Sequence, residues 1–374
     1  MPKKQQIVAE EIQVGKPIAA AAYDDKGRLL LSKGTVVKNQ QQLNALVQRG
    51  LYRQPNIRRK PAPRPSTKEA HISPFFIVDD LSKRLKGIFT GLLNKNKDMP
   101  TRICHLAHCI HIMCARDFDA SLGVIHLSDD LEYIHSHPLH VAILCELFAS
   151  FLNYESVRRE RLLVAALTAN LGMLSLQSEL HHQKKSLTAE QRQKIRNHPQ
   201  QATQILAAAG VTDGQWLKIV LQHHEYQDGT GYLGVMGDNI LEEAAIIALA
   251  DRYTAMVSPR EHRPPISASD GLKSLFLNKG NSYDETLSLV LIKMLGVFPP
   301  GSFVKLENGE TAVVIKRPVQ GMWPTVKSII TPQGSPINQP LLRNCNDDRY
   351  RIKELYTPAK LPPLNPSALW GYKN

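Results

Sequence analysis

The sequence lacks several features that would place it in a particular class of protein. No apolar run approaches the roughly 20 residues that a membrane-spanning helix needs, and AAIIALA (244–250) is among the longest. Basic residues open the chain, but no apolar stretch follows them, so we expect no secretory signal. The five cysteines form no even framework, and a chain of 374 residues needs none for stability. A reducing, cytoplasmic setting is therefore the expectation.

Two common catalytic signatures are also missing. The chain contains no phosphate-binding P-loop and no recognisable nucleophilic Ser or Cys triad. What it does contain is an ordinary globular composition, with 43% hydrophobic and 21% charged residues. That balance excludes wholesale disorder, because it supplies enough apolar surface to offset the entropy of ordering the chain.

Positive charge is in excess, but much of it lies in one short segment. The net charge is +12, and residues 53–68 (RQPNIRRKPAPRPSTK) carry six of the Lys and Arg residues and no acid. A Pro-broken basic segment is typical of a solvated linker, and that is the interpretation we favour. Contact with a polyanion, such as nucleic acid or lipid headgroups, is the alternative. We expect no dedicated nucleic-acid site.

The residue pattern divides the chain into five regions and predicts a mainly α protein. Apolar residues recur at helical spacing from about residue 73 to 296, in segments joined by short loops, which is typical of a helical bundle. Strand-like runs lie on both sides of this part. The regions are a small α+β domain (1–52), a basic Pro-rich linker (53–72), the helical domain (73–296), a short β extension (297–354) and a loose tail (355–374).

Local signals support the two flanking regions. Residues 24–27 (DDKG) predict a turn between the strand-like runs 12–23 and 28–37. Asn39 is placed to cap a helix that Gly50 would end. In the β extension, Asn308-Gly309 predicts a hairpin turn between two strands.

Histidines dominate the residues that could do chemistry. The sequence HHEYQDGTGYL (223–233) places His223 and His224 at a helix end, before a Gly-rich turn, where two imidazoles can face a metal. His137 starts an apolar helix, and His198 precedes Pro199 at an expected helix break. Asp251 lies inside the apolar segment AIIALADRYTAM, where a buried carboxylate is costly unless a cation compensates its charge.

Together these segments resemble the HD-GYP subgroup of the HD phosphohydrolases. HHEYQDGTGYL is similar to the family signature HHExxDGxGYP, with Leu233 in place of the last proline. The segments that begin at His137 (HPLHVA), contain His198 (IRNHPQQATQIL) and contain Asp251 (ALADRYTAMVSPREHRP) resemble further elements of the family. The β extension and the small N-terminal domain are also similar, so the resemblance covers nearly the whole chain.

The resemblance implies a helical domain with a metal centre, usually of iron or manganese, that hydrolyses cyclic di-GMP. In such a centre two cations share a bridging carboxylate and a bridging hydroxide that attacks phosphorus. On matching positions it implies one metal at His137 and Asp251, a second at His198, His223 and His224, and phosphate contacts from Arg260 and Arg263. The signature-loop residues are expected to orient ligands or stabilise the turn: Glu225, Asp228, Gly229, Gly231 and Tyr232.

The chain departs from the family at the residues that give it its name. The HDxGK element should fall in the helix at LTANLGML (167–174), where Ala169, Asn170 and Met173 replace the histidine, the aspartate and the lysine, while Gly172 is retained. Asparagine is a poor bridge between metals, because it supplies one neutral carbonyl oxygen and no shared anion. Tyr133 stands where three-metal members carry a glutamate, so no third metal is expected.

These losses predict a degenerate site. Two divalent cations among neutral imidazoles, with only Asp251 anionic, would be poorly compensated. We therefore expect one weakly held divalent metal (iron, manganese or zinc) or none. The predicted function is a role in cyclic di-GMP signalling through binding of the nucleotide or of a protein partner, such as a diguanylate cyclase domain. The alternative is an active metal-dependent cyclic di-GMP phosphodiesterase with an altered metal site.

A second cluster of metal-ligating residue types lies in RICHLAHCIHIMCARDF (102–118). On a helix Cys104, His108 and His111 would share one face, and His105 and Cys109 another. The spacing is not that of a closed zinc site. Ordinary helix packing, with cysteine as a small hydrophobe, is the interpretation we favour, and metal binding is the alternative.

Overall fold

A computed structural model of the chain describes most of residues 72–373 and short stretches before them. The gaps after residue 72 are 129–130, 184, 259–265, 278–282, 319–321 and 357–360, and the described stretches of the N-terminal region are 5–6, 14–16, 18, 22–23, 29–31, 34–42, 44 and 52–53. Contacts divide the chain into two compact units, Met1–Glu69 and Ala70–Asn374.

The N-terminal unit contains a small antiparallel sheet of order β1-β4-β2-β3. Its strands are β1 (Gln5–Gln6), β2 (Ala22–Tyr23), β3 (Leu29–Leu31) and β4 (Tyr52–Arg53). Asn39 accepts a hydrogen bond from the backbone N–H of Gln42 at 2.8 Å, as expected of a helix N-cap. Sheet and helical turn together confirm an α+β unit. The turn at 24–27, Gly50 and the linker from residue 54 to 71 lie outside the described residues.

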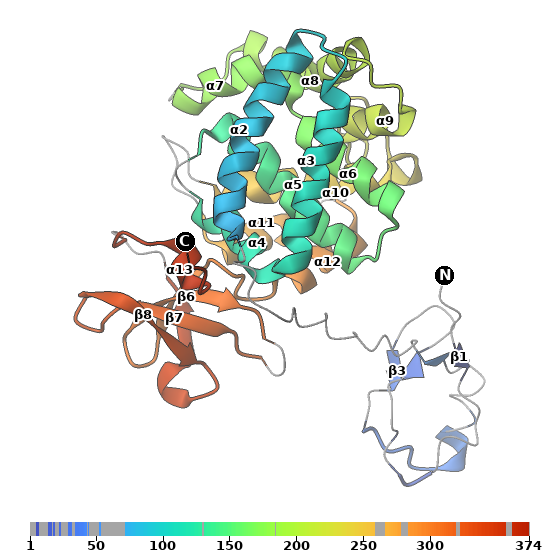
Figure 1. The fold of residues 1–374 in the computed structure, drawn as a ribbon. Coiled ribbons are helices and arrows are strands. Elements are labelled where there is room, and N and C mark those ends of the chain that lie inside the picture. The colour runs from blue at the N-terminus through green and yellow to red at the C-terminus, as the bar shows by residue number, and fades with distance from the viewer. Residues whose placement is uncertain are drawn as a thin grey trace. The chain divides into compact units, whose positions relative to one another are not determined.

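The second unit is built mainly of α-helices, which confirms the predicted fold class (Figure 1). Two short 3-10 segments, η2 (Leu171–Met173) and η3 (Gly237–Asn239), interrupt the series. The helices are α2 (Pro74–Leu93), α3 (Met99–Arg116), α4 (Phe118–Leu127), α5 (Tyr133–Phe151), α6 (Ser156–Thr168), α7 (Leu174–His182), α8 (Ala189–Ala208), α9 (Gly214–Gln222), α10 (Glu242–Val257), α11 (Ala268–Leu277) and α12 (Glu285–Leu295).

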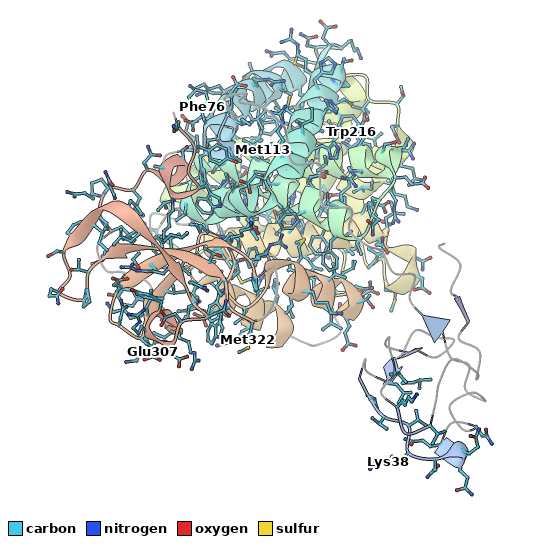
Figure 2. All side chains as sticks on the ribbon, turned by 60° about the horizontal axis from the view of Figure 1, so that its bottom comes forward. Lys38, Phe76, Met113, Trp216, Glu307 and Met322 are labelled. Carbon is cyan, nitrogen blue, oxygen red and sulfur yellow. The ribbon has the colours of Figure 1, made fainter. Side chains whose placement is uncertain are left out.

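Helix α5 forms the centre of this bundle. Almost every residue from His135 to Ala149 is buried, and the helix contacts α3, α4, α6 and α10. A helix that is apolar all round can be stable only when other helices cover it on all sides. Outer helices such as α2 instead bury one stripe, including Leu81, Leu85 and Leu92. Met113 of α3 belongs to this core, whereas Met322 projects from the β part (Figure 2).

Three helix boundaries differ from the sequence-based expectation. Helix α5 starts at Tyr133, one turn before His137. Helix α8 continues through Pro199, so the expected break after His198 is wrong. The segment that was expected to continue as a helix through 167–174 instead leaves α6 at Thr168 and turns through η2 into α7. The local pattern of apolar residues does not distinguish a continuous helix from one that bends within a fully packed core.

The β extension is an antiparallel sheet of order β8-β7-β6-β5-β9. Its strands are β5 (Phe303–Leu306), β6 (Thr311–Lys316), β7 (Thr325–Ile330), β8 (Pro336–Asn344) and β9 (Ile352–Leu355), with the 3-10 segment η4 (Asp348–Tyr350) before β9. The Asn308-Gly309 turn joins β5 and β6 as predicted, and Gly309 has a φ of +84° that suits glycine.

Polar contacts hold the β extension against the helical domain. Arg317 of the strand end donates to Asp119 of α4 at 2.5 Å and to the carbonyl of Met294 at 3.1 Å. The half-buried imidazole of His126 lies between the Pro300 carbonyl at 2.7 Å and the Tyr253 hydroxyl at 2.8 Å. Burial lowers the pKa of His126 to about 4, so the ring is neutral near pH 7.

The end of the chain is more ordered than predicted. A short helix, α13 (Pro366–Leu369), follows Asn365, and Leu369 is buried. The Trp370 ring packs on Phe75 of α2 at a centroid distance of 5.2 Å, and Ser367 donates to Ser73 at 2.8 Å. The prediction of a loose tail is therefore wrong for residues 366–373, because Pro-rich composition does not reveal an aromatic contact far away in sequence.

Among the helices that the structure describes, none combines the length and the apolar character that crossing a membrane requires. This agrees with the absence of long apolar runs in the sequence.

The half-buried His126 predicts that the folded chain becomes less stable as the pH falls. Between about pH 6.5, the ordinary pKa of histidine, and pH 4, the unfolded chain binds a proton that the folded chain excludes, so unfolding becomes easier as the pH falls. Replacing His126→Gln should cost about 1–3 kcal/mol at pH 7 by removing buried hydrogen bonds. It should also flatten the pH dependence of urea unfolding between pH 6.5 and 4. His105→Gln, at an exposed position of α3, is the matched control; equal pH slopes in wild type and His126→Gln would contradict the prediction.

Candidate metal centre

Three histidines from two elements meet at one point of the helical domain. His198 lies in the middle of α8, and His223 and His224 follow the last residue of α9. Their ring nitrogens all lie within 4.8 Å of one another, and among the described residues this is the group of histidine, cysteine and acidic side chains whose ligand atoms are gathered this closely. We call it the three-His cluster. The structure thus brings together the three residues that the sequence assigned to one metal.

Hydrogen bonds to the backbone determine how two of these imidazoles are protonated. His198 Nδ1 lies 2.6 Å from the carbonyl of Ile195, and His223 Nδ1 lies 2.6 Å from the carbonyl of Val220. Because a carbonyl only accepts, each Nδ1 carries the proton and donates it. The lone pairs of both rings are therefore on Nε2, which is the orientation that backbone carbonyls impose on metal-binding histidines.

The two lone pairs face each other. His198 Nε2 and His223 Nε2 are 3.1 Å apart. Two nitrogens that each lie about 2.1 Å from one cation, at an angle of roughly 90–110°, are about 3.0–3.4 Å apart. Burial lowers the pKa of His198 to about 4, and burial with the neighbouring His224 holds the pKa of His223 well below its usual range. Neutral imidazoles in this arrangement repel each other unless a cation lies between them, so the cluster fits one metal ion.

The Gly-rich loop after the histidines is held by Glu225. Its carboxylate accepts hydrogen bonds from the backbone N–H groups of Leu233 at 2.8 Å and Val235 at 2.7 Å. Gly231 lies so close that a Cβ would come 2.6 Å from the Glu225 Cα and 2.7 Å from the His224 carbonyl oxygen. Glu225 and Gly231 therefore shape the loop around the histidines, and the carboxylate is not free for a metal.

Asp228 and Gly229 form the tip of this loop, as expected of turn residues. Asp228 accepts from the backbone N–H and the hydroxyl of Thr230, at 3.0 and 2.6 Å, and Gly229 has a φ of +75°. The Tyr232 ring then packs against His224, at a centroid distance of 4.8 Å. Exposed Arg196 of α8 donates to the Tyr232 carbonyl at 3.2 Å, and its guanidinium lies 5.9 Å from the centre of the ring.

The second half of the candidate centre is organised around Asp251 of α10. His137 Nε2 lies 2.9 Å from Asp251 Oδ1, and the Asn170 side-chain amide donates to the same oxygen at 3.1 Å. His137 Nδ1 is 3.5 Å from the Thr254 hydroxyl, and the Tyr133 ring stacks on the imidazole at 5.0 Å. We call His137, Asn170, Asp251 and Thr254 the Asp251 network.

The carboxylate of this network is ionised although it is enclosed. Burial alone would raise the pKa of Asp251, but the hydrogen bond with His137 and the nearby imidazoles of His137, His224 and His223 hold it well below its usual range. These imidazoles belong to both halves, so the Asp251 network and the three-His cluster form one site. One oxygen of Asp251 already accepts two hydrogen bonds, and His137 Nε2 donates one of them. His137 Nε2 and Asp251 Oδ1 thus contact each other, and a metal bound by both atoms would have to displace this hydrogen bond.

No replacement for the missing ligands comes from the segment around Asn170. Ala169 is buried at the end of α6 and offers no ligand atom, and Met173 is a half-buried thioether at the end of η2. A thioether is a soft ligand that suits iron or manganese poorly.

Gly172 determines where Asn170 lies relative to the three-His cluster. A Cβ at this position would come 2.2 Å from the carbonyl oxygen of His198 and 2.8 Å from the backbone N of Ala202. The backbones of η2 and α8 therefore touch, which places Asn170 beside the helix that carries His198.

Two residues expected to contact phosphate lie outside the described residues, and two residues near the site were not predicted from the sequence. Arg260 and Arg263 lie in the segment 259–265, outside the described residues. Thr254 was missed, although its place three residues after Asp251 on one helix puts both on the same face. Arg196 was missed because its contact with Tyr232 joins residues far apart in sequence.

Comparison with known proteins agrees with this arrangement. A family model described as an HD domain matches residues 125–287, a range that contains all the residues of the three-His cluster and the Asp251 network. A cyclic di-GMP phosphodiesterase of Pseudomonas aeruginosa is 26% identical over 200 residues, which are 53% of this chain and 48% of that protein. Residues 125–287 thus match an HD domain, and the likeness to a cyclic di-GMP phosphodiesterase supports the resemblance to the HD-GYP family.

Other relatives cover less of this chain. A cyclic di-GMP phosphodiesterase response regulator of Xanthomonas campestris is 26% identical over 126 residues, 32% of each chain. A 3'3'-cGAMP-specific phosphodiesterase of Vibrio cholerae is 24% identical over 160 residues, 42% of this chain and 31% of that one. The chain thus spans less than half the length of these curated relatives.

One solved structure shares the fold. An HDG"Y"P protein from Bdellovibrio bacteriovorus aligns with 78% of this chain and 99% of its own length, at a TM-score of 0.51 and 16% sequence identity. At this identity the likeness concerns the fold alone.

The contact at Gly172 predicts a sensitive position in the HD domain. Gly172→Ala should destabilise the domain by about 1–3 kcal/mol, because η2 and α8 must move apart to admit the methyl group. Gly87→Ala in α2 is the matched control: a Cβ there meets nothing within 4 Å, and removing an exposed helical glycine should be neutral or stabilise by up to about 1 kcal/mol. Urea unfolding of both variants measures the difference, and equal stabilities would show that the backbones do not touch.

Proposed function

We propose that this chain is catalytically impaired and takes part in cyclic di-GMP signalling mainly by binding, with the nucleotide as its first ligand. The observation that carries the proposal is the hydrogen bond from the Asn170 amide to Asp251 Oδ1, at 3.1 Å. An amide donates where the family signature has a carboxylate, which can only accept when it is ionised.

The hydrogen bond matters because it removes the need for a metal in this half of the site. An aspartate at position 170 would put a second negative charge beside Asp251, and two such carboxylates are stable together only when a cation or proton lies between them. Asn170 removes that repulsion and supplies a donor instead. His137 supplies another donor to the same oxygen. Oδ1 of Asp251 is therefore satisfied by protein groups alone.

Charge balance supports one metal at most. Asp251 is the anionic side chain of the described site, because Glu225 is engaged with the backbone of the Gly-rich loop. Two divalent cations would leave a large excess of positive charge in a poorly solvated site, whereas a single cation at the three-His cluster leaves a small one. We propose one weakly held iron, manganese or zinc ion at His198, His223 and His224.

The surroundings of the cluster suit a cyclic dinucleotide. A cation and the exposed guanidinium of Arg196 are partners for phosphate, and the Tyr232 ring offers an aromatic face beside them. We propose that Arg260 and Arg263 add further phosphate contacts. The curated relatives described above act on cyclic di-GMP or 3'3'-cGAMP by name, which supports this ligand class. A protein partner, such as a diguanylate cyclase domain, would bind the form of this chain that holds the nucleotide.

An active phosphodiesterase with a one-metal site is the second candidate. The observation that favours it is the three-His cluster itself, because catalytic zinc sites commonly use three protein ligands and leave one position open. Such an ion could activate a water molecule near a bound phosphate. The chain would still lack the bridging anion and the lysine of the family, so turnover distinguishes the two candidates.

Metal content tests the proposed division of the site. Purified protein reconstituted with iron(II) or manganese(II) should retain at most one equivalent by elemental analysis. His223→Gln should abolish metal retention because it removes one of the three ligands of the cluster. His137→Gln should leave retention unchanged because His137 lies outside the three-His cluster. Two equivalents in the wild type, or equal losses in both variants, would contradict a single metal at the three-His cluster.

Binding without turnover is the expected behaviour towards nucleotide. Isothermal titration with cyclic di-GMP should give a saturable heat, stronger with metal present, while chromatography of the same mixture shows little linear dinucleotide or GMP. Restoring the family residues with Ala169→His, Asn170→Asp and Met173→Lys should raise turnover on the order of 100-fold, since electrostatic groups in active sites are worth several kcal/mol each.

A double variant isolates the bridging position. Ala169→His with Met173→Lys keeps Asn170 and should turn over no faster than the wild type. Efficient hydrolysis by the wild-type chain would instead establish the second candidate. Absence of any binding of cyclic di-GMP, with or without metal, would remove the nucleotide from the proposal.

A further inference from the structure

A pocket of about 330 Å³ lies between α3 and the start of α6, apart from the candidate metal centre. None of its lining residues belongs to the three-His cluster or to the Asp251 network. Figure 1 shows α3 and α6 on the same side of the helical domain. We call it the α3 pocket; it is lined by Cys104, Ala107, His108, His111, Tyr154, Ser156, Arg159, Glu160 and Leu163.

The helical repeat concentrates metal-ligating side chains on one wall of this pocket. Cys104, His108 and His111 follow one another at spacings of four and three residues, so they share the face of α3 that lines the pocket. From the facing helix α6, Glu160 also lines the pocket. The face predicted from the sequence is thus confirmed, and α6 adds a fourth candidate ligand.

The orientation of His111 is typical of a metal ligand. Its Nδ1 lies 2.9 Å from Oε1 of Glu146 and 3.2 Å from Nη1 of Arg159, which holds the ring with Nδ1 towards this buried ion pair. In the tautomer that donates from Nδ1 to the carboxylate, the lone pair is on Nε2, the atom left for a metal. A carboxylate that receives the second N–H of an imidazole orients metal-binding histidines in many proteins and makes them better donors.

Glu146 is an unusual carboxylate for a helix core. It is fully buried in α5, and Oε1 also accepts from Arg159 at 2.7 Å and from the Ser150 hydroxyl at 3.0 Å. Its other oxygen, Oε2, has no hydrogen-bond partner in the structure. A buried carboxylate is costly, and here its ion pair with Arg159 and its contact with His111 both lie at the wall of the α3 pocket.

The charge and chemistry of the wall favour a cation over an anion. The guanidinium of Arg159 is already paired with Glu146 and also donates to the Tyr154 carbonyl at 3.2 Å. The remaining wall groups, a thiol, two imidazoles and a carboxylate, all offer electron pairs. Mixed sulfur and nitrogen donors with one carboxylate suit zinc and similar borderline ions better than magnesium or calcium.

We propose that the α3 pocket is a second metal site, which binds one zinc-type divalent cation through Cys104, His108, His111 and Glu160. The four ligand atoms are not yet gathered within 4.8 Å of one another, so binding requires side-chain rotation. His108 is exposed and Cys104 and His111 are half-buried, which leaves them room to rotate. Metal binding displaces the thiol proton of Cys104 to solvent. The proposal is independent of what binds at the three-His cluster.

Cobalt(II) distinguishes the two sites by spectroscopy, because only a thiolate ligand gives a sulfur-to-cobalt charge-transfer absorption. The three-His cluster contains no sulfur. Full-length protein, reduced and free of metal, is titrated with cobalt(II). The absorption should rise to saturation and disappear when zinc is added in competition.

Matched variants on the same helix locate the site. Cys104→Ser should abolish the absorption, and His108→Ala, at an exposed position where truncation leaves the fold intact, should weaken cobalt binding at least tenfold. Cys109→Ser and His105→Ala, on the other face of α3, should behave like the wild type. No absorption in the wild type, absorption that survives Cys104→Ser, or equal loss in Cys109→Ser would overturn the proposal. Far-UV circular dichroism checks that each variant is folded.

Discussion

The candidate centre depends on how one enclosed negative charge is compensated. Asp251 lies in an apolar helix, and the cost of placing a carboxylate there must be met by donors or cations close by. Helix α5 supplies His137, and the turn after α6 supplies Asn170, both to the same carboxylate oxygen. With protein donors in both places, one oxygen of this carboxylate is compensated by the protein itself.

The same packing that satisfies Asp251 also builds the neighbouring three-His cluster. Gly172 allows the backbone of η2 to touch that of α8, and this contact brings His198 into the centre of the domain. Backbone carbonyls in turn hold His198 and His223 with their Nε2 atoms facing each other. In the Asp251 network, protein groups donate to the carboxylate. In the three-His cluster, two nitrogen lone pairs face each other and favour a cation between them. This asymmetry is the basis of the proposed single-metal site.

The signature residues of the Gly-rich loop have structural roles that do not depend on catalysis. Glu225 binds two backbone N–H groups, and Gly231 leaves no room for a side chain. These roles are structural, so the loop keeps its shape whether or not catalysis continues. Persistence of HHEYQDGTGYL is thus compatible with the proposed impaired site, in which the residues at 169, 170 and 173 would carry the functional difference.

Much of this protein could be inferred from its sequence, and the limits of that inference have physical causes. Helical periodicity predicted the bundle and the shared face of Cys104, His108 and His111. The helix cap at Asn39 and the turn at Asn308-Gly309 were also predicted correctly, because both depend only on neighbouring residues. The grouping of His198, His223 and His224 followed from resemblance to a family signature.

Other features depend on partners that are distant along the chain, and only the tertiary structure decided them. The donation from Asn170 to Asp251, the position of His126 between Pro300 and Tyr253, and the docking of Trp370 on Phe75 each join residues far apart in sequence. Composition and periodicity describe how a segment folds relative to itself. Which oxygen receives which proton is determined by packing between segments, because hydrogen bonds depend on distances that no local pattern encodes.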